Sequence, residues 1–426
     1  MYKRIVILGS GTAGTLTANR LRRVYDEGEC RIDVVDQNDD HTYQPGLLFV
    51  PFGLAEPHAL CRSRQKQLRG GIGYRRAEVD RVDLDTRHVH FTDGTGLGYD
   101  VLVIATGAVL LPEETEGLTG PGWNEKVFTF YDLPGATALH RALENFSGGR
   151  VIVNVTDMPI KCPVAPLEFA FLADWYFQQR GIRDRVELTY VTPLDGAFTK
   201  PVASQALGGL LKEKGIDLVT EFTTGSVDGP GGRLISYDDR EVPFDLAVVV
   251  PLHGGAPCIG RSPGLGDDLG FVPVDRHTLQ SVARPEVFAI GDATGLPVSK
   301  AGSVAHFQGE TLVDNIRRYL AGRPLDASYD GHTNCFIETG FGKALLIDFN
   351  YETEPLPGHY PAAVGLPLLK ESRANHLGKR AFEWLYWHSL LPGRDLPGIT
   401  PAMPEHGKTR ARTDLHTRTG TRKGTS

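Results

Sequence analysis

The sequence predicts an α/β protein with two parallel-sheet units and a C-terminal α+β region. Two observations predict this class. A β-branched, apolar strand at residues 3–8 leads into a glycine-rich turn and a helix, and a second strand–helix–strand unit begins at Arg150. The 426 residues suffice for two or three domains with buried cores. An apolar fraction of 41% and a charged fraction of 23% are ordinary for a globular chain, so a fibrous architecture is not expected.

The first unit carries the pattern of a dinucleotide-binding turn. Gly9, Gly11 and Gly14 form a G-x-G-x-x-G motif between the first strand and a helix expected to run to about residue 25. The first glycine permits the turn, the second lets the backbone approach a pyrophosphate, and the third packs helix against strand. Asp36 ends the next strand, residues 31–36, where a carboxylate can bond ribose hydroxyls. The pattern indicates a Rossmann-like domain.

A meander is expected around residues 72–96, where apolar and polar residues alternate. The continuously apolar run at residues 99–107 predicts a strand buried on both faces. Another such strand is expected at residues 285–292, and a helical pattern follows from about Ala301 to Leu320.

Two later motifs indicate that the expected dinucleotide is FAD. The stretch Ala105–Gly107 and the stretch Ala289–Asp292 resemble the further motifs of two-domain flavin disulfide reductase-like enzymes. The resemblance implies that Asp292 binds the ribityl or pyrophosphate part of FAD. The following helix would direct its positive end at the flavin, and Lys300 could add a full charge, with a solvated lysine as the alternative. The residues expected to contact FAD are Gly9, Gly11, Thr12, Ala13, Gly14, Asp36, Gln37, Gln44, Pro45, Val79, Ala105, Thr106, Gly107, Gly291, Asp292, Lys300 and Ala301.

The second unit lacks a phosphate-binding turn. Its first strand, residues 151–155, leads into residues 156–166, which contain prolines and Cys162 in place of glycines. Prolines remove backbone donors and fix φ, and side chains fill the space that a pyrophosphate would need. A nicotinamide nucleotide is therefore expected to bind poorly. A helix after Pro166 and strands at residues 186–191 and 245–251 complete this unit.

The five cysteines are widely spaced and form no C-x-x-C pair, so no metal site is expected. Cys30, Cys61 and Cys258 are expected to be small buried apolar residues.

The remaining motifs resemble the sulfide:quinone oxidoreductases and the related flavocytochrome c sulfide dehydrogenases. The resemblance rests on residues 41–46, 159–168, 334–343 and 368–379, and spans the chain to about residue 395. It implies that Cys162 and Cys335 form a redox-active pair beside the flavin ring, and that the acceptor is a quinone. Glu168 could accept a proton, with a solvent-facing helix acid as the alternative.

Two positions depart from patterns seen in these families. Residues 108–110 are Ala-Val-Leu, which excludes a flavin linked through a cysteine after the Ala-Thr-Gly motif. The histidine that some members use near the quinone is not evident at residues 192–195, so the proton route to the quinone is not assigned.

The expected function is FAD-dependent oxidation of sulfide to sulfane sulfur or polysulfide, with electrons passed to a membrane quinone. A type II NADH:quinone dehydrogenase-like flavoenzyme is the main alternative, and a flavin-bound redox sensor or interaction protein is another. The expected partners are sulfide, a sulfur acceptor, the quinone and a membrane surface, with a homo-oligomer left open. The net charge of −7 argues against nucleic acid as a partner.

We expect cytoplasmic synthesis without a signal peptide and peripheral attachment to the cell membrane. Residues 381–391 place Phe382, Trp384, Leu385, Trp387 and Leu391 where an amphipathic helix could lie in a membrane interface. A core-packed terminal helix is the alternative. Basic residues flank the segment and recur in the tail: Lys379, Arg380, Arg394, Lys408, Arg410, Arg412, Arg418, Arg422 and Lys423.

The expected domains are a discontinuous FAD-binding domain, a second Rossmann-like domain, a C-terminal quinone- and membrane-facing region, and a basic, disordered tail. Their expected ranges are 1–110 with 282–322, 111–281, 323–404 and 405–426, respectively.

Overall fold

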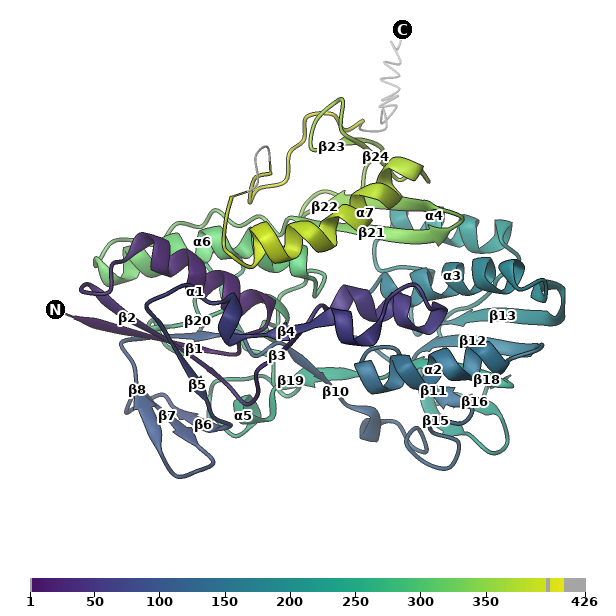
Figure 1. Ribbon diagram of the computed structural model, residues 1–426, viewed down its shortest axis with the longest axis horizontal. Helices are drawn as coiled ribbons and strands as arrows, with labels where there is room; N and C mark the ends of the chain where they lie inside the picture. Colours follow the sequence, from purple (N-terminus) through teal and green to yellow (C-terminus); the bar gives the residue numbers. More distant parts are fainter. Residues whose placement is uncertain (1, 396–398, 410–426) are drawn as a thin grey trace, which may run out of the picture.

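The computed structural model describes residues 2–395 and 399–409. Its centre consists of two parallel sheets, each covered by helices on one face and by a small antiparallel sheet on the other (Figure 1). The α/β class predicted from the sequence is confirmed.

The first sheet has the strand order β20-β9-β1-β2-β5, with all strands parallel. Alternate residues of β1 face opposite cores. Ile5 and Ile7 belong to the core that includes helices α1 and α6, whereas Val6 and Leu8 belong to a separate core shared with the sheet β6-β7-β8 and helix α5. This double burial explains the unbroken apolar run. The strands and helices are β1 (Lys3–Leu8), β2 (Cys30–Asp36), β5 (Ile72–Arg76), β9 (Val101–Ile104), β20 (Val287–Ala289), α1 (Thr12–Val24), α6 (Gly302–Leu320), α5 (Pro257–Gly260), β6 (Val79–Asp83), β7 (His88–Phe91) and β8 (Gly96–Gly98).

The expected meander begins later than residue 72. Residues 72–76 form β5, which pairs in parallel with β2 and extends the first sheet, so only β6, β7 and β8 form the meander.

The second sheet has the order β11-β18-β12-β13-β14 and is also parallel. Val151 and Val153 face the core shared with helices α2, α3 and α4, and Ile152 faces the sheet β15-β16-β17. The elements are β11 (Val127–Phe128), β12 (Gly149–Val155), β13 (Val186–Val191), β14 (Asp217–Val219), β18 (Leu246–Val250), α2 (Leu133–Asn145), α3 (Ala165–Gln179), α4 (Pro201–Glu213), β15 (Thr224–Asp228), β16 (Arg233–Ser236) and β17 (Glu241–Pro243).

Short elements join the two sheets. The chain leaves the first sheet through β10 (Ala108–Leu110) and returns through β19 (His253–Gly255), and these two strands pair antiparallel. A second pair, β3 (Asp40–Thr42) and β4 (Cys61–Ser63), flanks the 3-10 helix η1 (Gln44–Phe52). The other short helices are η2 (Pro57–Leu60), η3 (Gln65–Gln67), η4 (Pro112–Glu114), η5 (Arg183–Arg185) and η6 (Gly291–Ala293).

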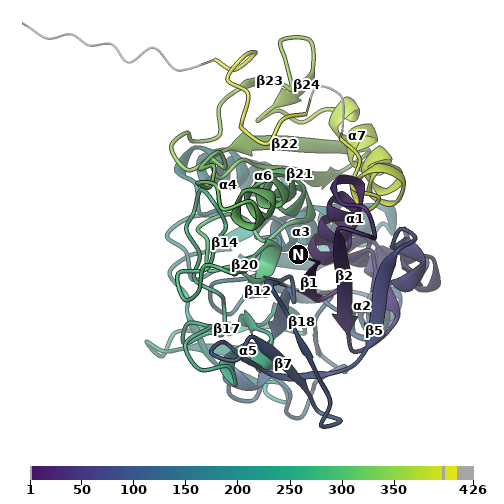
Figure 2. The same ribbon diagram turned by 90° about the vertical axis from the view of Figure 1, so that its left-hand side faces the viewer.

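The C-terminal region covers one side of both α/β units. A hairpin of β21 (Thr333–Gly340) and β22 (Lys343–Phe349) lies between helix α3 and helix α7 (Arg373–Leu385), as Figure 2 shows from the side. A π-helix (Tyr386–Leu390) continues α7, and β23 (Gly358–Tyr360) pairs with β24 (Leu366–Leu368). Among residues 2–395 and 399–409, no helix has both the length and the apolar character needed to cross a bilayer.

The expectation of a disordered tail from residue 405 is wrong for its first residues. Gly358 pairs with Lys408, and the Thr409 N–H donates to the Pro357 carbonyl at 2.8 Å. The Lys408 ammonium is buried in an ion pair with Asp348, whose other oxygen lies 2.8 Å from His332 Nε2. A buried carboxylate therefore fixes this segment. The basic residues Arg410, Arg412, Arg418, Arg422 and Lys423 lie outside the described residues.

Candidate active site

The glycine-rich turn packs tightly at two glycines and leaves open space at the third. Gly9 has φ +95°, and a Cβ there would lie 2.3 Å from the Ala105 carbonyl oxygen. A Cβ at Gly14 would lie 1.9 Å from the Gly9 carbonyl oxygen, so neither position accepts a side chain. A Cβ at Gly11 would meet nothing within 4 Å. Gly11 caps helix α1 without a side-chain hydrogen bond, which leaves the first N–H groups of the helix for an anion.

Asp36 lies beside this turn at the carboxyl end of β2. Its Oδ2 accepts hydrogen bonds from the Ser10 N–H at 2.7 Å and from the Ser10 hydroxyl at 2.9 Å, and forms an ion pair with Arg64. These contacts use one carboxylate oxygen, so Oδ1 can still accept a ribose hydroxyl. The sequence reasoning missed Arg64, because no local pattern connects it to Asp36.

The two later motifs meet the first turn. Gly107 has φ +72° with nothing within 4 Å of an added Cβ, and the buried Thr106 hydroxyl has no hydrogen-bond partner among the described residues. A Cβ at Gly291 would lie 3.0 Å from the Ala13 Cβ, and one at Gly302 would lie 3.7 Å from Thr12 Cγ2. The N-termini of α1 and α6 therefore converge, and both direct positive partial charge toward the same place.

Asp292 and Lys300 lie at this convergence. Burial raises the pKa of the Asp292 carboxyl, while the nearby Lys300 and Lys161 oppose the rise. The Asp292 carboxylate accepts no hydrogen bond from the described residues, so it is available to a ligand. The Lys300 ammonium donates to the carbonyls of Asp292 at 3.0 Å and Thr294 at 2.8 Å, and burial lowers its pKa to about 8. The Lys300 ammonium therefore stabilises the turn at residues 292–294 and does not face solvent.

The other expected cofactor contacts surround this centre. Gln37 follows Asp36 and is exposed, while Gln44 and Pro45 are exposed at the start of η1. Val79 is half-buried at the start of β6, and Ala301 caps helix α6. The open glycine positions, the unpartnered Thr106 hydroxyl, the free Asp292 carboxylate and the two helix N-termini fit the pyrophosphate and ribityl parts of FAD.

Cys162 is fixed beside the start of α6. It has φ +43°, and its N–H donates to the Lys300 carbonyl at 2.8 Å. Its carbonyl accepts from the Ala165 N–H at 2.8 Å and from the Tyr131 hydroxyl at 3.3 Å. Burial raises the pKa of the Cys162 thiol to about 12, and the nearby Glu168 adds to the rise.

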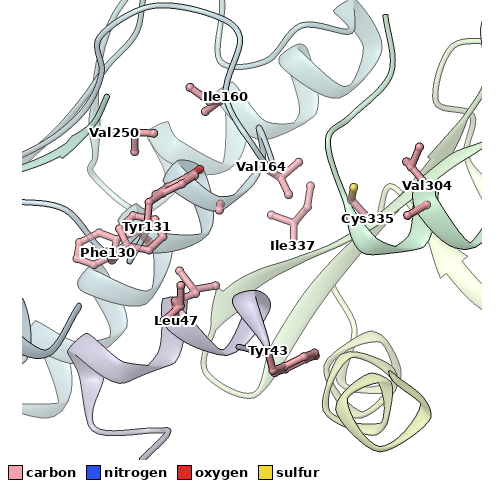
Figure 3. Packing of buried hydrophobic residues seen from close by; sticks show 14 of the residues in the cluster. Tyr43, Leu47, Phe130, Tyr131, Ile160, Val164, Val250, Val304, Cys335 and Ile337 are labelled. Atoms are coloured by element: carbon pink, nitrogen blue, oxygen red, sulfur yellow. The ribbon is translucent and has the colours of Figure 1, made fainter. Parts of the chain in front are cut away.

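Cys335 approaches the same segment from the C-terminal hairpin. It is buried in β21, and Figure 3 shows it between Ile337 and Val304. The Ser303 hydroxyl on α6 donates to the carbonyl of the preceding Asn334 at 2.8 Å. Burial raises the pKa of the Cys335 thiol well above its usual value, and the charge of Cys162 is the next cause. Both thiols are free. Cys162 is hydrogen-bonded to Lys300, and Asn334, the neighbour of Cys335, is hydrogen-bonded to Ser303, so both cysteines lie close to residues 300–303.

Glu168 is buried, so its interpretation as a solvent-facing acid is wrong. Its Oε1 accepts from the Glu338 N–H at 2.6 Å and forms an ion pair with Lys379 of helix α7. Burial raises the pKa of the Glu168 carboxyl, and Lys379 opposes the rise. Strand β21 of the C-terminal hairpin packs on this face of α3, and Lys379 reaches Glu168 from α7, which the sequence of α3 alone could not reveal.

A pocket of about 290 Å³ lies between η1, α3, the C-terminal hairpin and α7. Its wall is mainly apolar, and Glu338 and His376 form a hydrogen-bonded pair at 2.8 Å on one side. Lys379 joins this pocket to Glu168. The lining includes Tyr43, Phe49, Leu54, Leu172, Trp175, Phe341, Lys379, Arg380 and Glu383.

Comparisons with known proteins relate this chain to one family model and to enzymes of one name. Residues 3–155 match the family model described as pyridine nucleotide-disulphide oxidoreductase. The mitochondrial sulfide:quinone oxidoreductase of Dictyostelium discoideum is 28% identical over 399 residues, which cover 92% of this chain and 86% of the relative. The Mus musculus enzyme of the same name is 26% identical over 405 residues, covering 92% and 87%. The chain is a homologue of the sulfide:quinone oxidoreductases.

A solved structure of a sulfide:quinone oxidoreductase from Aquifex aeolicus matches the fold of this homologue with a TM-score of 0.78. The match has 19% identity and covers 92% of each chain. A partial match, 27% identical over 317 residues and 68% of this chain, is an NADH dehydrogenase-like protein of Mycobacterium tuberculosis. The matches support a flavin-dependent oxidoreductase with a Rossmann-type nucleotide-binding fold.

The segment at residues 381–391 differs from the expected interfacial helix. Helix α7 ends at Leu385, and Trp387 and Leu391 in the following turns are buried in the core. They therefore cannot face lipid. The large exposed apolar side chains of α7 are Leu377, at 64%, and Trp384, at 61%.

Among the other cysteines, Cys30 and Cys258 are buried as expected. Cys61 is only partly buried, and its sulfur lies 3.5 Å from the Thr42 hydroxyl.

Proposed function

We propose that this homologue oxidises sulfide through Cys162 and Cys335 and passes the electrons through FAD to a quinone. One observation carries the proposal: segments far apart in the sequence bring the two cysteines to residues 300–303, at the start of α6. The N-terminus of α6 in turn meets the glycine-rich turn at Gly9–Gly14, which is called the cofactor turn below. The family relationship supplies the substrate class, since the named relatives are sulfide:quinone oxidoreductases.

The sulfur step begins from a disulfide between Cys162 and Cys335. Hydrosulfide attacks one sulfur, so one cysteine becomes a persulfide and the other leaves as a thiolate. A second nucleophile removes the outer sulfur and leaves a second cysteine thiolate. Re-forming the disulfide releases two electrons. These electrons reduce a quinone to a quinol, which also takes up two protons.

FAD, when bound, would supply the two-electron carrier between the thiol pair and the quinone. The residues that would hold it are those of the turn at Gly9–Gly14, together with Asp36, Thr106 and Asp292. The N-termini of α1 and α6 would stabilise negative charge on the cofactor.

Glu168 is proposed as the proton acceptor near Cys162. Its buried carboxyl has a raised pKa, and its charge acts on the thiols of both Cys162 and Cys335. A raised pKa places a carboxyl closer to neutral pH, where a group can both accept and release a proton.

The quinone is proposed to bind in the pocket between η1 and α7. Leu54 and Phe341 line this pocket and are also exposed, at 46% and 40%. Leu377 and Trp384 add exposed apolar surface on α7. We propose that this side of the protein contacts the membrane, so that a lipid-soluble quinone reaches the pocket from the bilayer. This proposed face keeps Trp384 from the segment expected from the sequence and adds Leu377, whereas Trp387 and Leu391 are buried.

An anaerobic flavin titration tests the function. Sulfide should bleach the flavin absorbance rapidly, and a soluble quinone should restore it. NADH should reduce the flavin far more slowly, because β12 leads into the turn around Cys162 and not into a glycine-rich turn. Equally fast reduction by NADH would support an NADH dehydrogenase, and no reduction by sulfide would support a sensor.

A further inference from the structure

The Tyr386 hydroxyl joins the C-terminal segment to the cofactor turn. It lies 2.7 Å from Thr12 Oγ1 and 2.6 Å from His41 Nε2, although 374 positions separate Tyr386 from Thr12. The other ring nitrogen of His41, Nδ1, lies 3.2 Å from the Ser10 carbonyl oxygen. The three side chains thus form one chain of hydrogen bonds across the turn.

When His41 is neutral, only one arrangement of protons allows all of these hydrogen bonds to form. Burial lowers the pKa of His41 to about 4, so the ring carries a single N–H at neutral pH. The Ser10 carbonyl can only accept, which places this N–H on Nδ1. His41 Nε2 must therefore accept from the Tyr386 hydroxyl, and the Thr12 hydroxyl must donate to Tyr386.

The direction of these hydrogen bonds determines which donors the cofactor turn can offer to a phosphate. The single hydroxyl proton of Thr12 points at Tyr386 and is unavailable to a phosphate. Thr12 can then offer an anion only its backbone N–H at the start of α1. The Ser10 peptide is held at the same time, since its N–H donates to Asp36 and its carbonyl accepts from His41.

Neighbouring contacts hold Tyr386 in place. It is buried, and the next residue, Trp387, packs under the Arg62 guanidinium at 4.1 Å. The Asn19 amide on α1 donates to the Leu391 carbonyl at 2.8 Å. The end of the C-terminal segment is therefore part of the wall of the first α/β unit.

We propose that Tyr386 is a positioning residue for FAD, which fixes Thr12 and His41 so that the backbone donors of the turn are preset for the pyrophosphate. The inference rests on the FAD binding stated in the proposed function. It predicts that cofactor affinity depends on a C-terminal tyrosine that does not belong to the dinucleotide motif.

The test measures FAD binding to apoprotein by flavin fluorescence, without any turnover. Tyr386→Phe should raise the Kd for FAD by about 3- to 10-fold, as expected for loss of a neutral hydrogen bond with buried groups left unpaired. The matched control is Tyr360→Phe, which removes a hydroxyl from another buried tyrosine that contacts His332 in the C-terminal region. The control should leave the Kd unchanged. Thermal unfolding of each apoprotein shows whether a change in Kd merely follows lost stability.

A double mutant separates positioning from direct contact. Thr12→Val removes the hydroxyl that donates to Tyr386. The Kd for FAD of the variant that carries both substitutions should not exceed the larger of the two single-variant Kd values. Multiplied effects would mean that Thr12 acts on FAD independently, and would overturn the inference. So would an unchanged Kd for Tyr386→Phe, or an equal rise in Tyr360→Phe. A wild-type chain that binds no FAD would overturn the proposed function as well.

Discussion

Lys379 on helix α7 forms an ion pair with the buried carboxylate of Glu168 on helix α3, although 211 positions separate the two residues. The pair joins the vicinity of Cys162 to the pocket that Lys379 lines. It offers a link between the sulfur chemistry and the proposed quinone site that no motif of the sequence indicates.

Removing the Glu168 carboxylate should slow the sulfur chemistry and leave FAD binding unchanged. Glu168→Gln keeps the size of the side chain and can still accept from the Glu338 N–H, but it cannot act as a base. Sulfide-driven flavin reduction in stopped flow should fall about a hundredfold, as is common when a general base is lost. Glu187→Gln, at an exposed position of β13, serves as the control. A Glu168→Gln rate equal to wild type would exclude Glu168 as the base.

Removing Lys379 should shift the pH dependence of the same step. Lys379 lowers the pKa of Glu168 against the rise caused by burial, so Lys379→Met should raise this pKa further. A base must be deprotonated to act, and a higher pKa means that deprotonation requires a higher pH. The acidic limb of the pH–rate profile for flavin reduction should therefore move to higher pH. An unmoved or lowered limb would contradict this assignment.

The cysteine pair has the sharpest test. Replacing either Cys162 or Cys335 by Ser should abolish sulfide-driven flavin reduction while FAD stays bound, because the persulfide and the leaving thiolate each need one sulfur. Cys258→Ser, a buried thiol outside the site, should retain the activity. If both single variants still reduce quinone with sulfide at near wild-type rate, the thiol mechanism is wrong.

Asp36 should contribute to FAD affinity. Asp36→Ala removes the ribose acceptor and leaves the Ser10 donors and Arg64 without their partner. The expected loss of FAD binding free energy is about 1–3 kcal/mol. Gel filtration in FAD-free buffer, followed by the flavin absorbance, measures retention. Full occupancy after this step would show that the turn does not hold the cofactor.

Membrane attachment should depend on the exposed face of α7. Leu377→Glu with Trp384→Glu places two charges on this face and should reduce flotation with anionic liposomes. Val282→Glu provides the control, since Val282 is 72% exposed elsewhere on the surface. A wild-type protein that never floats would refute attachment. These substitutions leave the C-terminal segment in place, whereas deleting the residues after Arg373 would also remove the buried Tyr386 and Leu391.

Much of the cofactor site could be predicted from the sequence, because its requirements are local. Gly9 and Gly14 must lack a Cβ wherever a strand turns tightly into a helix, and Asp36 ends the neighbouring strand. The proline-containing turn around Cys162 is likewise visible in the chain. The partners that complete the site were not predictable in this way. Arg64 pairs with Asp36 from a separate loop, and Gln308 accepts from the Gly291 N–H across the start of α6.

The sequence by itself determined the two α/β units, the dinucleotide turn and the identity of the groups that can do chemistry. Only the tertiary structure decided which of these groups are buried and paired. Glu168 on its helix and Lys408 in a basic tail both suggest solvent exposure, yet each is enclosed by segments from elsewhere in the chain. The physical reason is that strand and helix patterns follow from neighbouring residues, whereas burial and charge pairing follow from whatever segment packs on top.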